Sequence, residues 1–265
     1  MASLFLSTRD LNVLEKIQDP EFDPSQAVEV DSSLPKDPHV TDVTEYERIA
    51  TEEKNMILAV QQVELELAGL KPMTGSSPVD AYKNCLGGLS TLIAAKPSYA
   101  SARNNRVQVV RRLYGDGMLV TGVDPSDSPL IAIGDVPERQ AAASQALSDL
   151  DTCISLLSPT EVHAQISPHA VKTLSLAHTQ RAAIYHQTSK TLARGGELQI
   201  QGDRREAFWT TLDFQEAASS DFAMGGRYGN EIAKGLAVST NPTAKLCGQM
   251  VREAMKKEYG PAFSG

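Results

Sequence analysis

The stretch PSYASARNNRVQVVRRLYGD, from Pro97 to Asp116, is the most informative part of the chain. Pro97 ends one helix, small residues after Tyr99 begin the next, and a Gly-Asp pair closes that helix after Tyr114. The paired helices of a stacked helical repeat are separated in this way. The stretch therefore predicts a repeat protein that holds another protein, a role that requires no catalytic residue.

The composition favours helices and excludes several classes of function. Aromatic residues make up 5% of the 265 residues, which suits helices better than sheets. The net charge of −8 and the isoelectric point near 5.2 argue against nucleic-acid binding, which needs an excess of cations. No apolar run is long enough to predict a membrane span. The cysteines (Cys85, Cys153 and Cys247) are odd in number and far apart, so we expect reduced thiols and a cytoplasmic protein.

Three regions follow one another along the chain. Residues 1–43 are expected to be a flexible, proline-rich leader after a short helix at 10–18. Residues 44–225 are expected to hold three helix pairs with inserted loops at 117–137 and 195–202, and residues 226–265 to form capping helices and a tail. The expected helices are 44–69, 79–95, 99–114, 138–157, 170–193, 203–221, 230–237 and 242–258.

Local signals set several of these boundaries. Thr44 is expected to cap the first long helix, and Ser167, followed by a proline, the helix at 170–193. A short strand is expected at 130–133. Glycines 225, 226 and 229 are expected to break the chain between helices. The fold class is thus all-α, a right-handed solenoid of antiparallel helix pairs.

A spacing of four then three residues recurs in the second helix of each predicted pair. The triplets are Cys85, Leu89 and Leu92; Ala146, Leu150 and Cys153; and Thr210, Phe214 and Ala217. A modest residue, a large apolar one and another modest one allow close helix packing, although any amphipathic helix can show such steps. The triplets resemble the tetratricopeptide repeat, but they are 61 and 64 positions apart, whereas that repeat is about 34 residues long.

At a finer level the chain resembles the tetratricopeptide repeat protein 36 family from about residue 44 to 255. The resembling segments are ASARNNR (100–106) with RRL (111–113) and GD (115–116), ALSDLDTCI (146–154), DFQEAA (213–218), NPTAKLCGQM (241–250) and VLEKI (13–17). This resemblance implies a non-catalytic, intracellular scaffold of three repeats. It also implies an association with seventy-kilodalton heat-shock chaperones and with tyrosine metabolism.

Some tetratricopeptide domains hold the acidic C-terminus of a chaperone with a clamp of five Lys, Asn and Arg side chains. Asn105 matches one of the five positions, and the other four fall on Ala59, Val63, Leu176 and Gln180. We therefore predict that this mode of capture is absent. The remaining groove candidates are Asn104, Asn105, Gln108, Arg111 and Arg112 on one helix and Thr179, His186 and Gln187 on another.

Two interpretations of the 99–114 helix stay open. Arg103, Arg106, Arg111 and Arg112 form either a docking patch for an acidic segment or a solvated face paired with neighbouring carboxylates. Asn105 either contacts a ligand or bonds loop backbone between repeats.

Catalytic and metal sites are not predicted. Histidines 163, 169, 178 and 186 lie within two dozen residues, but 178 and 186 are two helical turns apart and no cysteine or carboxylate completes a site. Glycines 225, 226 and 229 lack the preceding strand and the Lys-Ser/Thr of a phosphate loop.

We expect an adapter without cofactor, metal or nucleic acid, which binds a chaperone or its client. The alternative is a structural subunit that dimerises through an exposed apolar face.

Overall fold

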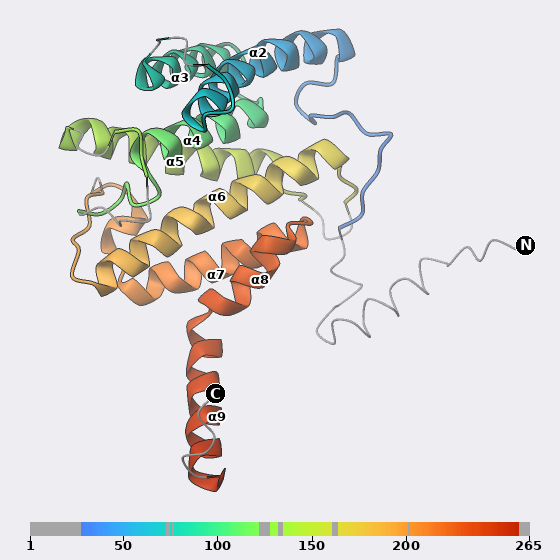
Figure 1. Cartoon of the computed structure of the whole chain (residues 1–265). Coiled ribbons are helices and arrows are strands. Elements are labelled where there is room, and N and C mark those ends of the chain that lie inside the picture. The colour runs from blue at the N-terminus through green and yellow to red at the C-terminus, as the bar shows by residue number, and fades with distance from the viewer. Residues whose placement is uncertain are drawn as a thin grey trace, which may run out of the picture.

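The computed structural model describes residues 28–72, 75, 77–121, 128–131, 135–160, 164–200 and 202–259. These residues form eight α-helices and one 3₁₀ helix (Figure 1), which confirms the all-α class. Within them, β pairing is limited to three isolated bridges. The helices are α2 (Val43–Leu67), α3 (Pro78–Ala95), α4 (Ala100–Tyr114), α5 (Val136–Leu157), α6 (Pro168–Ala193), α7 (Thr211–Arg227), α8 (Glu231–Thr240) and α9 (Pro242–Tyr259), with η2 (Arg205–Phe208) before α7. The expected leader helix at 10–18 lies outside the described residues.

Side-chain caps start most of these helices. Ser167 accepts a hydrogen bond from the backbone N–H of Ala170, and Pro168 occupies the first turn of α6, as predicted. The cap of α2 is Asp42 and not Thr44, since the Asp42 carboxylate accepts from the N–H of Glu45 at 2.7 Å. A carboxylate at this position also interacts favourably with the helix dipole.

The helix expected at 203–221 is divided in two. Residues 205–208 form η2, and α7 begins only at Thr211 because Thr210 and Asp213 form a capping box. Thr210 is therefore an exposed cap and not the first packing residue of a third triplet. The expected break at Gly225 and Gly226 is also wrong, because α7 continues through both glycines. The turn comes at Gly229, whose φ of +93° favours glycine.

Gly226 lies at a close contact between α7 and α8. A Cβ built on it would lie 2.8 Å from both the Cα and the Cβ of Lys234 on α8. Gly226→Ala is expected to push α8 away from α7 and to lower the free energy of unfolding by about 1–3 kcal/mol. Urea unfolding measures this change. The control is Gly235→Ala in α8, where a Cβ meets open space and the helix should gain about 0.5–1 kcal/mol.

The helices pack in the order of the chain. Each helix from α2 to α8 contacts the next one, and α4 also contacts α6. The shared core is built from large side chains that are almost fully buried: Ile49, Leu89, Leu113, Leu150, Leu174, Tyr185 and Phe214. The stack is layered from α2 and α3 to α7 and α8, and α9 projects away from it (Figure 1). α9 thus does not cover the last pair as a capping helix would.

The inserted loops contact each other and the end of α4. Val120 and Leu198 form an antiparallel bridge, supported by the N–H of Gln199 donating to the carbonyl of Leu119 at 2.7 Å. Instead of a strand at 130–133, the N–H groups of Leu130 and Ile131 donate to carbonyls in the last turn of α4, while residues 132–134 lie outside the described residues. Free carbonyls at a helix end need such donors. Within the described part of the chain, no helix is both long and apolar enough to span a membrane.

Candidate functional site

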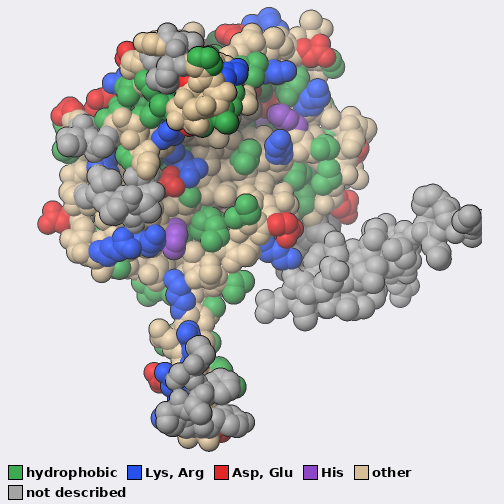
Figure 2. Space-filling view, viewed as in Figure 1, with side chains coloured by type: hydrophobic (Ala, Val, Ile, Leu, Met, Phe, Trp, Pro, Cys, Tyr) green, Lys and Arg blue, Asp and Glu red, His purple; other side chains and the backbone are tan. Residues whose placement is uncertain are grey.

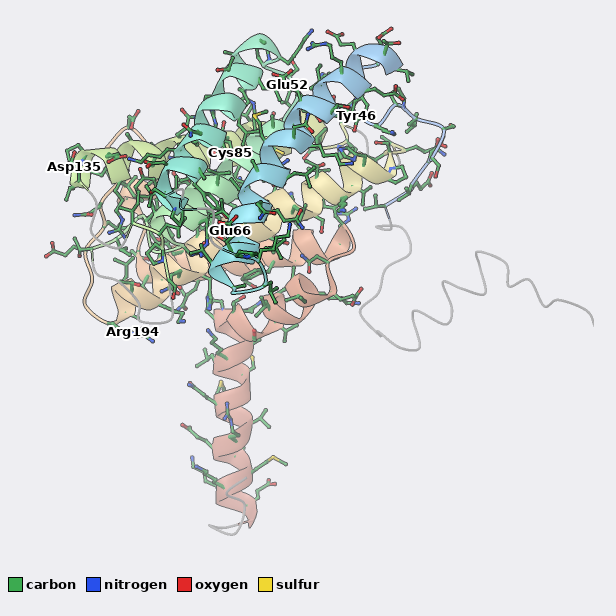
Figure 3. The ribbon with its side chains drawn as sticks, turned by 45° about the horizontal axis from the view of Figure 1, so that its top comes forward. Tyr46, Glu52, Glu66, Cys85, Asp135 and Arg194 are labelled. Atoms are coloured by element: carbon green, nitrogen blue, oxygen red, sulfur yellow. The ribbon has the colours of Figure 1, made fainter. Side chains whose placement is uncertain are left out.

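A cavity of about 680 Å³ lies between α2 and α4, next to the loop at Ser128. Figure 3 shows α2 crossing the other helices from Tyr46 to Glu66. The cavity is lined by Ile57, Val60, Gln61 and Glu64 of α2, by Tyr82 of α3, by Asn105, Gln108, Val109, Arg111 and Arg112 of α4, and by Asp116 and Ser128. Four of the eight predicted groove residues therefore meet in one place: Asn105, Gln108, Arg111 and Arg112.

Arg112 closes one side of the cavity through an ion pair with α2. Its guanidinium donates to Glu64 Oε1 at 2.8 Å and Oε2 at 3.3 Å, and to the carbonyl of Ser128 at 2.6 Å. The hydroxyl of Tyr82 donates to the same carboxylate at 2.9 Å. Burial acts to raise the pKa of Glu64, but the hydrogen bonds from Arg112 and Tyr82 outweigh it and hold this pKa below its usual value. Glu64 is thus ionised and already neutralises the arginine.

Arg111 also forms an ion pair with a carboxylate. Its Nε and Nη2 donate to the two carboxylate oxygens of Asp116 at 2.6 and 2.9 Å, and its Nη1 reaches Gln180 of α6 at 3.3 Å. Gln180 in turn donates to the side-chain and backbone oxygens of Asn104 at 2.7 and 3.1 Å. Asn104 is buried, so it joins α4 to α6 and is not available to a partner.

Asn105 joins α4 to α2 through a buried carboxylate. Its amide donates to Glu53 Oε1 at 2.7 Å, and the hydroxyl of Tyr99 donates to Oε2 at 2.6 Å. Ser101 completes the set of donors around Glu53. Burial together with the negative charge of Glu53 raises the pKa of Tyr99. Asn105 therefore bonds a neighbouring helix, and not the loop backbone that the sequence suggested as the alternative.

Two amide side chains in the cavity are free. Gln61 and Gln108 are both exposed, and within the described residues neither makes a hydrogen bond or an ion pair. An amide group both donates and accepts, so it can pair with a peptide unit. Ile57, Val60 and Val109 supply an apolar lining beside them. The sequence signal for Gln61 is its helical spacing, because it follows Ile57 by four residues and therefore lies on the same face of α2.

The remaining predicted groove residues lie outside this cavity. Thr179 donates to the carbonyl of Ser175 at 2.7 Å and accepts from Asn230 at 3.1 Å, so it faces the α7–α8 turn. His186 lies against the ring of Phe222 on α7, and burial lowers its pKa. The amide nitrogen of Gln187 is buried. α6 packs along α7, which takes these side chains away from the α2–α4 cavity.

The arginines of α4 are internally paired. Arg103 and Arg106 both bond the carboxylate of Asp149 on α5, which is fully buried, while Arg111 and Arg112 bond the two cavity carboxylates. Side chains of both signs are interspersed over the face in Figure 2, rather than gathered by sign. The structure thus favours the paired face over an arginine docking patch.

A histidine–aspartate pair joins α6 to α7. His178 Nδ1 lies 2.8 Å from Asp221 Oδ1, and Arg181 bonds both oxygens of the same carboxylate at 2.7 Å. Both members are buried, and the ring stacks on Tyr228 with centroids 5.9 Å apart. The pair is 43 residues apart in sequence, so no local pattern could reveal it. Among the described residues, no group of three or more His, Cys, Asp or Glu side chains is arranged to hold a metal.

Comparison with known proteins gives this chain a relative over nearly its whole length. No family model matches the chain, and no solved structure matches it. It is 31% identical over 257 residues to the L-tyrosine degradation gene cluster protein hmgX of Aspergillus fumigatus (strain ATCC MYA-4609 / CBS 101355 / FGSC A1100 / Af293). The match covers 96% of this chain and 93% of that protein. An identity of this level over nearly the whole of both chains shows that this chain belongs to the hmgX family.

Proposed function

We propose that this chain is a non-catalytic adapter of tyrosine degradation, which binds a segment of a partner protein in the α2–α4 cavity. The observation that carries the proposal is the combination of an apolar lining with two amides that make no hydrogen bond to the described residues, in a cavity whose charged groups already pair with each other. The link to tyrosine degradation rests on the family relationship to hmgX, which is named for that gene cluster.

The cavity chemistry favours a neutral, extended segment. An acidic chaperone tail needs free cations, but Arg111 and Arg112 are both held by carboxylates. Gln61 and Gln108 can instead bond the backbone of an extended segment, whose apolar side chains would enter between Ile57, Val60 and Val109. We therefore expect the partner to be an enzyme of tyrosine degradation, and binding to depend little on salt. A seventy-kilodalton heat-shock chaperone or its client is the second partner to test.

The proposal includes the finer architecture and the compartment. We propose that α2 to α7 form a right-handed, tetratricopeptide-like solenoid of three pairs closed by α8. The succession of neighbouring helices and the additional α4–α6 contact support this arrangement.

A cytoplasmic location is supported by the buried, unpaired Cys85 and Cys153. Burial raises the pKa of Cys85 to about 11 and that of Cys153 to about 12, so both thiols stay protonated.

The test replaces both free amides. Gln61→Arg with Gln108→Arg fills the cavity and adds unpaired charge, so we expect binding of the partner to weaken at least about 10-fold, the loss of about 1.4 kcal/mol. Purified tyrosine-degradation enzymes, and the chaperone with and without ATP, are the binding partners in a calorimetric titration. Circular dichroism checks that the helices are retained.

The matched control is Asn55→Arg, an exposed substitution on α2 that does not line the cavity. It should leave binding unchanged. Equal binding by the cavity variant, or an equal loss in the control, contradicts the proposed site. Detection of turnover of a tyrosine-degradation intermediate by the purified chain alone contradicts the non-catalytic role.

A further inference from the structure

The last helix of the chain carries an apolar face that none of the described residues covers. At 100° per residue, one half of the circumference of α9 holds Ala244, Leu246, Cys247, Met250, Val251, Ala254 and Met255, which we call the α9 apolar face; Thr243 at its beginning and Lys257 and Glu258 at its end are the polar residues on the same side. No side chain from Thr243 to Glu258 is buried. α9 projects from the body beyond its start beside α7 and α8 (Figure 1). A helix with such a face is stable in water only when the face is covered.

The helix before it also carries exposed apolar side chains. Ile232 and Val238 of α8 are 75% and 69% exposed, and Leu246, Met250 and Val251 follow on α9 at 56–62%. Scattered exposed apolar residues are ordinary, but a concentration of this kind marks an interaction surface. The surface is distinct from the α2–α4 cavity, because no residue of α8 or α9 lines that cavity.

The charge of α9 is opposite to that of the rest of the chain. The helix carries Lys245, Arg252, Lys256 and Lys257 against Glu253 and Glu258, so removing its +2 from the chain's −8 leaves −10. Lys245, Arg252 and Lys256 lie on the side opposite the α9 apolar face, and Lys256 and Lys257 are the basic residues of the last turn, which also contains Glu258. A second copy of this chain therefore offers both an identical apolar face and an acidic body for these cations.

We propose that α9 pairs with α9 of a second copy in an antiparallel arrangement, which makes the chain a two-fold dimer. A parallel pair would bring two acidic bodies side by side, because each body precedes the N-terminus of its own α9. An antiparallel pair separates the bodies by the length of the helix, about 27 Å, and sets each basic last turn near the other body. The same apolar face then contacts itself, as an isologous interface requires.

The alternative occupant, a membrane surface, fits the helix less well. Helices that lie on membranes usually carry Trp or Phe among their apolar residues, and α9 holds neither of these two residues. The acidic body would also be repelled by anionic lipid. The test therefore includes anionic vesicles.

The decisive experiment compares two adjacent substitutions in the full-length chain. Met250→Asp places a charge in the α9 apolar face, and Gln249→Asp places the same charge on the opposite side of the helix. We expect the unmodified chain and Gln249→Asp to sediment at about twice 28.6 kDa, and Met250→Asp to sediment as a monomer with dimerisation weakened at least about 100-fold. Circular dichroism checks that the body stays folded.

Cys247 reports the direction of the pair, since it is the exposed cysteine of the described residues and lies on the α9 apolar face. With the centre of an antiparallel pair between Met250 and Val251, the two Cys247 side chains are offset by roughly 10 Å along the axis. A bismaleimide of that span should join two chains, and Cys247→Ser should prevent it. Fast disulfide formation without the reagent would instead indicate a parallel pair and overturn the arrangement.

Three other results overturn the proposal: a monomeric unmodified chain at micromolar concentrations, a Met250→Asp variant that stays dimeric, and co-sedimentation with anionic vesicles in place of dimerisation. The proposed adapter function fails independently, because its test changes Gln61 and Gln108 in the cavity and leaves α9 intact.

Discussion

Asp149→Asn is expected to lower the free energy of unfolding by about 3–5 kcal/mol, the cost of breaking a buried ion pair from one side. Asp149 is fully buried in α5 and accepts from Arg106 at 2.7 Å through both oxygens and from Arg103 at 3.0 Å. The asparagine keeps the volume but removes the charge, which leaves Arg106, itself 8% exposed, without a counterion. Because these bonds join α4 to α5, their loss loosens the centre of the stack.

Urea unfolding at pH 7 measures this effect. The control is Glu52→Gln, which breaks an exposed pair on α2, where Glu52 lies 3.5 Å from Arg48. Exposed pairs contribute little, so the control should lose less than about 1 kcal/mol. A loss below about 1 kcal/mol in Asp149→Asn would mean that the two arginines find other partners. Arg103→Met, at the more exposed end of the cluster, provides a milder variant if Asp149→Asn does not fold.

Local sequence signals predict several helix boundaries of this chain. The Ser167-Pro168 start of α6 and the Pro97 stop after α3 act within one turn, so neighbouring residues determine them. The expected helix start at 203 is wrong although a local signal marks the true start of α7, since Thr210 and Asp213 have the spacing of a capping box. The expected break at Gly225 and Gly226 is wrong because tertiary contact decides there: both glycines remain helical where α8 packs closely over them.

The candidate site could be predicted only in part, because it also depends on tertiary contacts. Four of the eight candidate groove residues, Asn105, Gln108, Arg111 and Arg112 of α4, line the cavity. Asp116, which pairs with Arg111, is only five residues away, but the partners on other helices could not be predicted, because Glu64 is 48 residues from Arg112 and Gln180 is 69 residues from Arg111. The position of Thr179 and His186 depends on the rotation of α6 against α7, which the periodicity of one helix does not specify. Hydrophobic periodicity defines a buried face, but it does not say which neighbour covers it.

The pH dependence of stability should depend on Glu206, the acidic residue of η2. Its side chain is 0% exposed, and it accepts hydrogen bonds from Tyr185 at 2.8 Å and from Arg204 at 3.0 Å. Burial acts to raise the pKa of Glu206, but the bonds from Arg204 and Tyr185 outweigh it and lower this pKa to about 2. The folded carboxyl therefore holds its proton less tightly than the unfolded one. The ionised Glu206 carboxylate therefore contributes fully to the stability of the fold above about pH 4.5, and this contribution is lost as the pH falls toward 2.

Glu206→Gln is expected to lower the free energy of unfolding by about 3 kcal/mol at pH 6, which corresponds to the shift of the pKa from about 4.5 to about 2. The difference between variant and unmodified chain should shrink to about 2 kcal/mol at about pH 3.5, because protonation removes the same charge that the substitution removes. Urea unfolding at a series of pH values gives both curves. Glu216→Gln, at an exposed position of α7, should cost less than about 0.5 kcal/mol throughout. A Glu206→Gln deficit that stays constant from about pH 6 to about pH 3.5 would show that lost packing, and not the charge of the carboxylate, accounts for it.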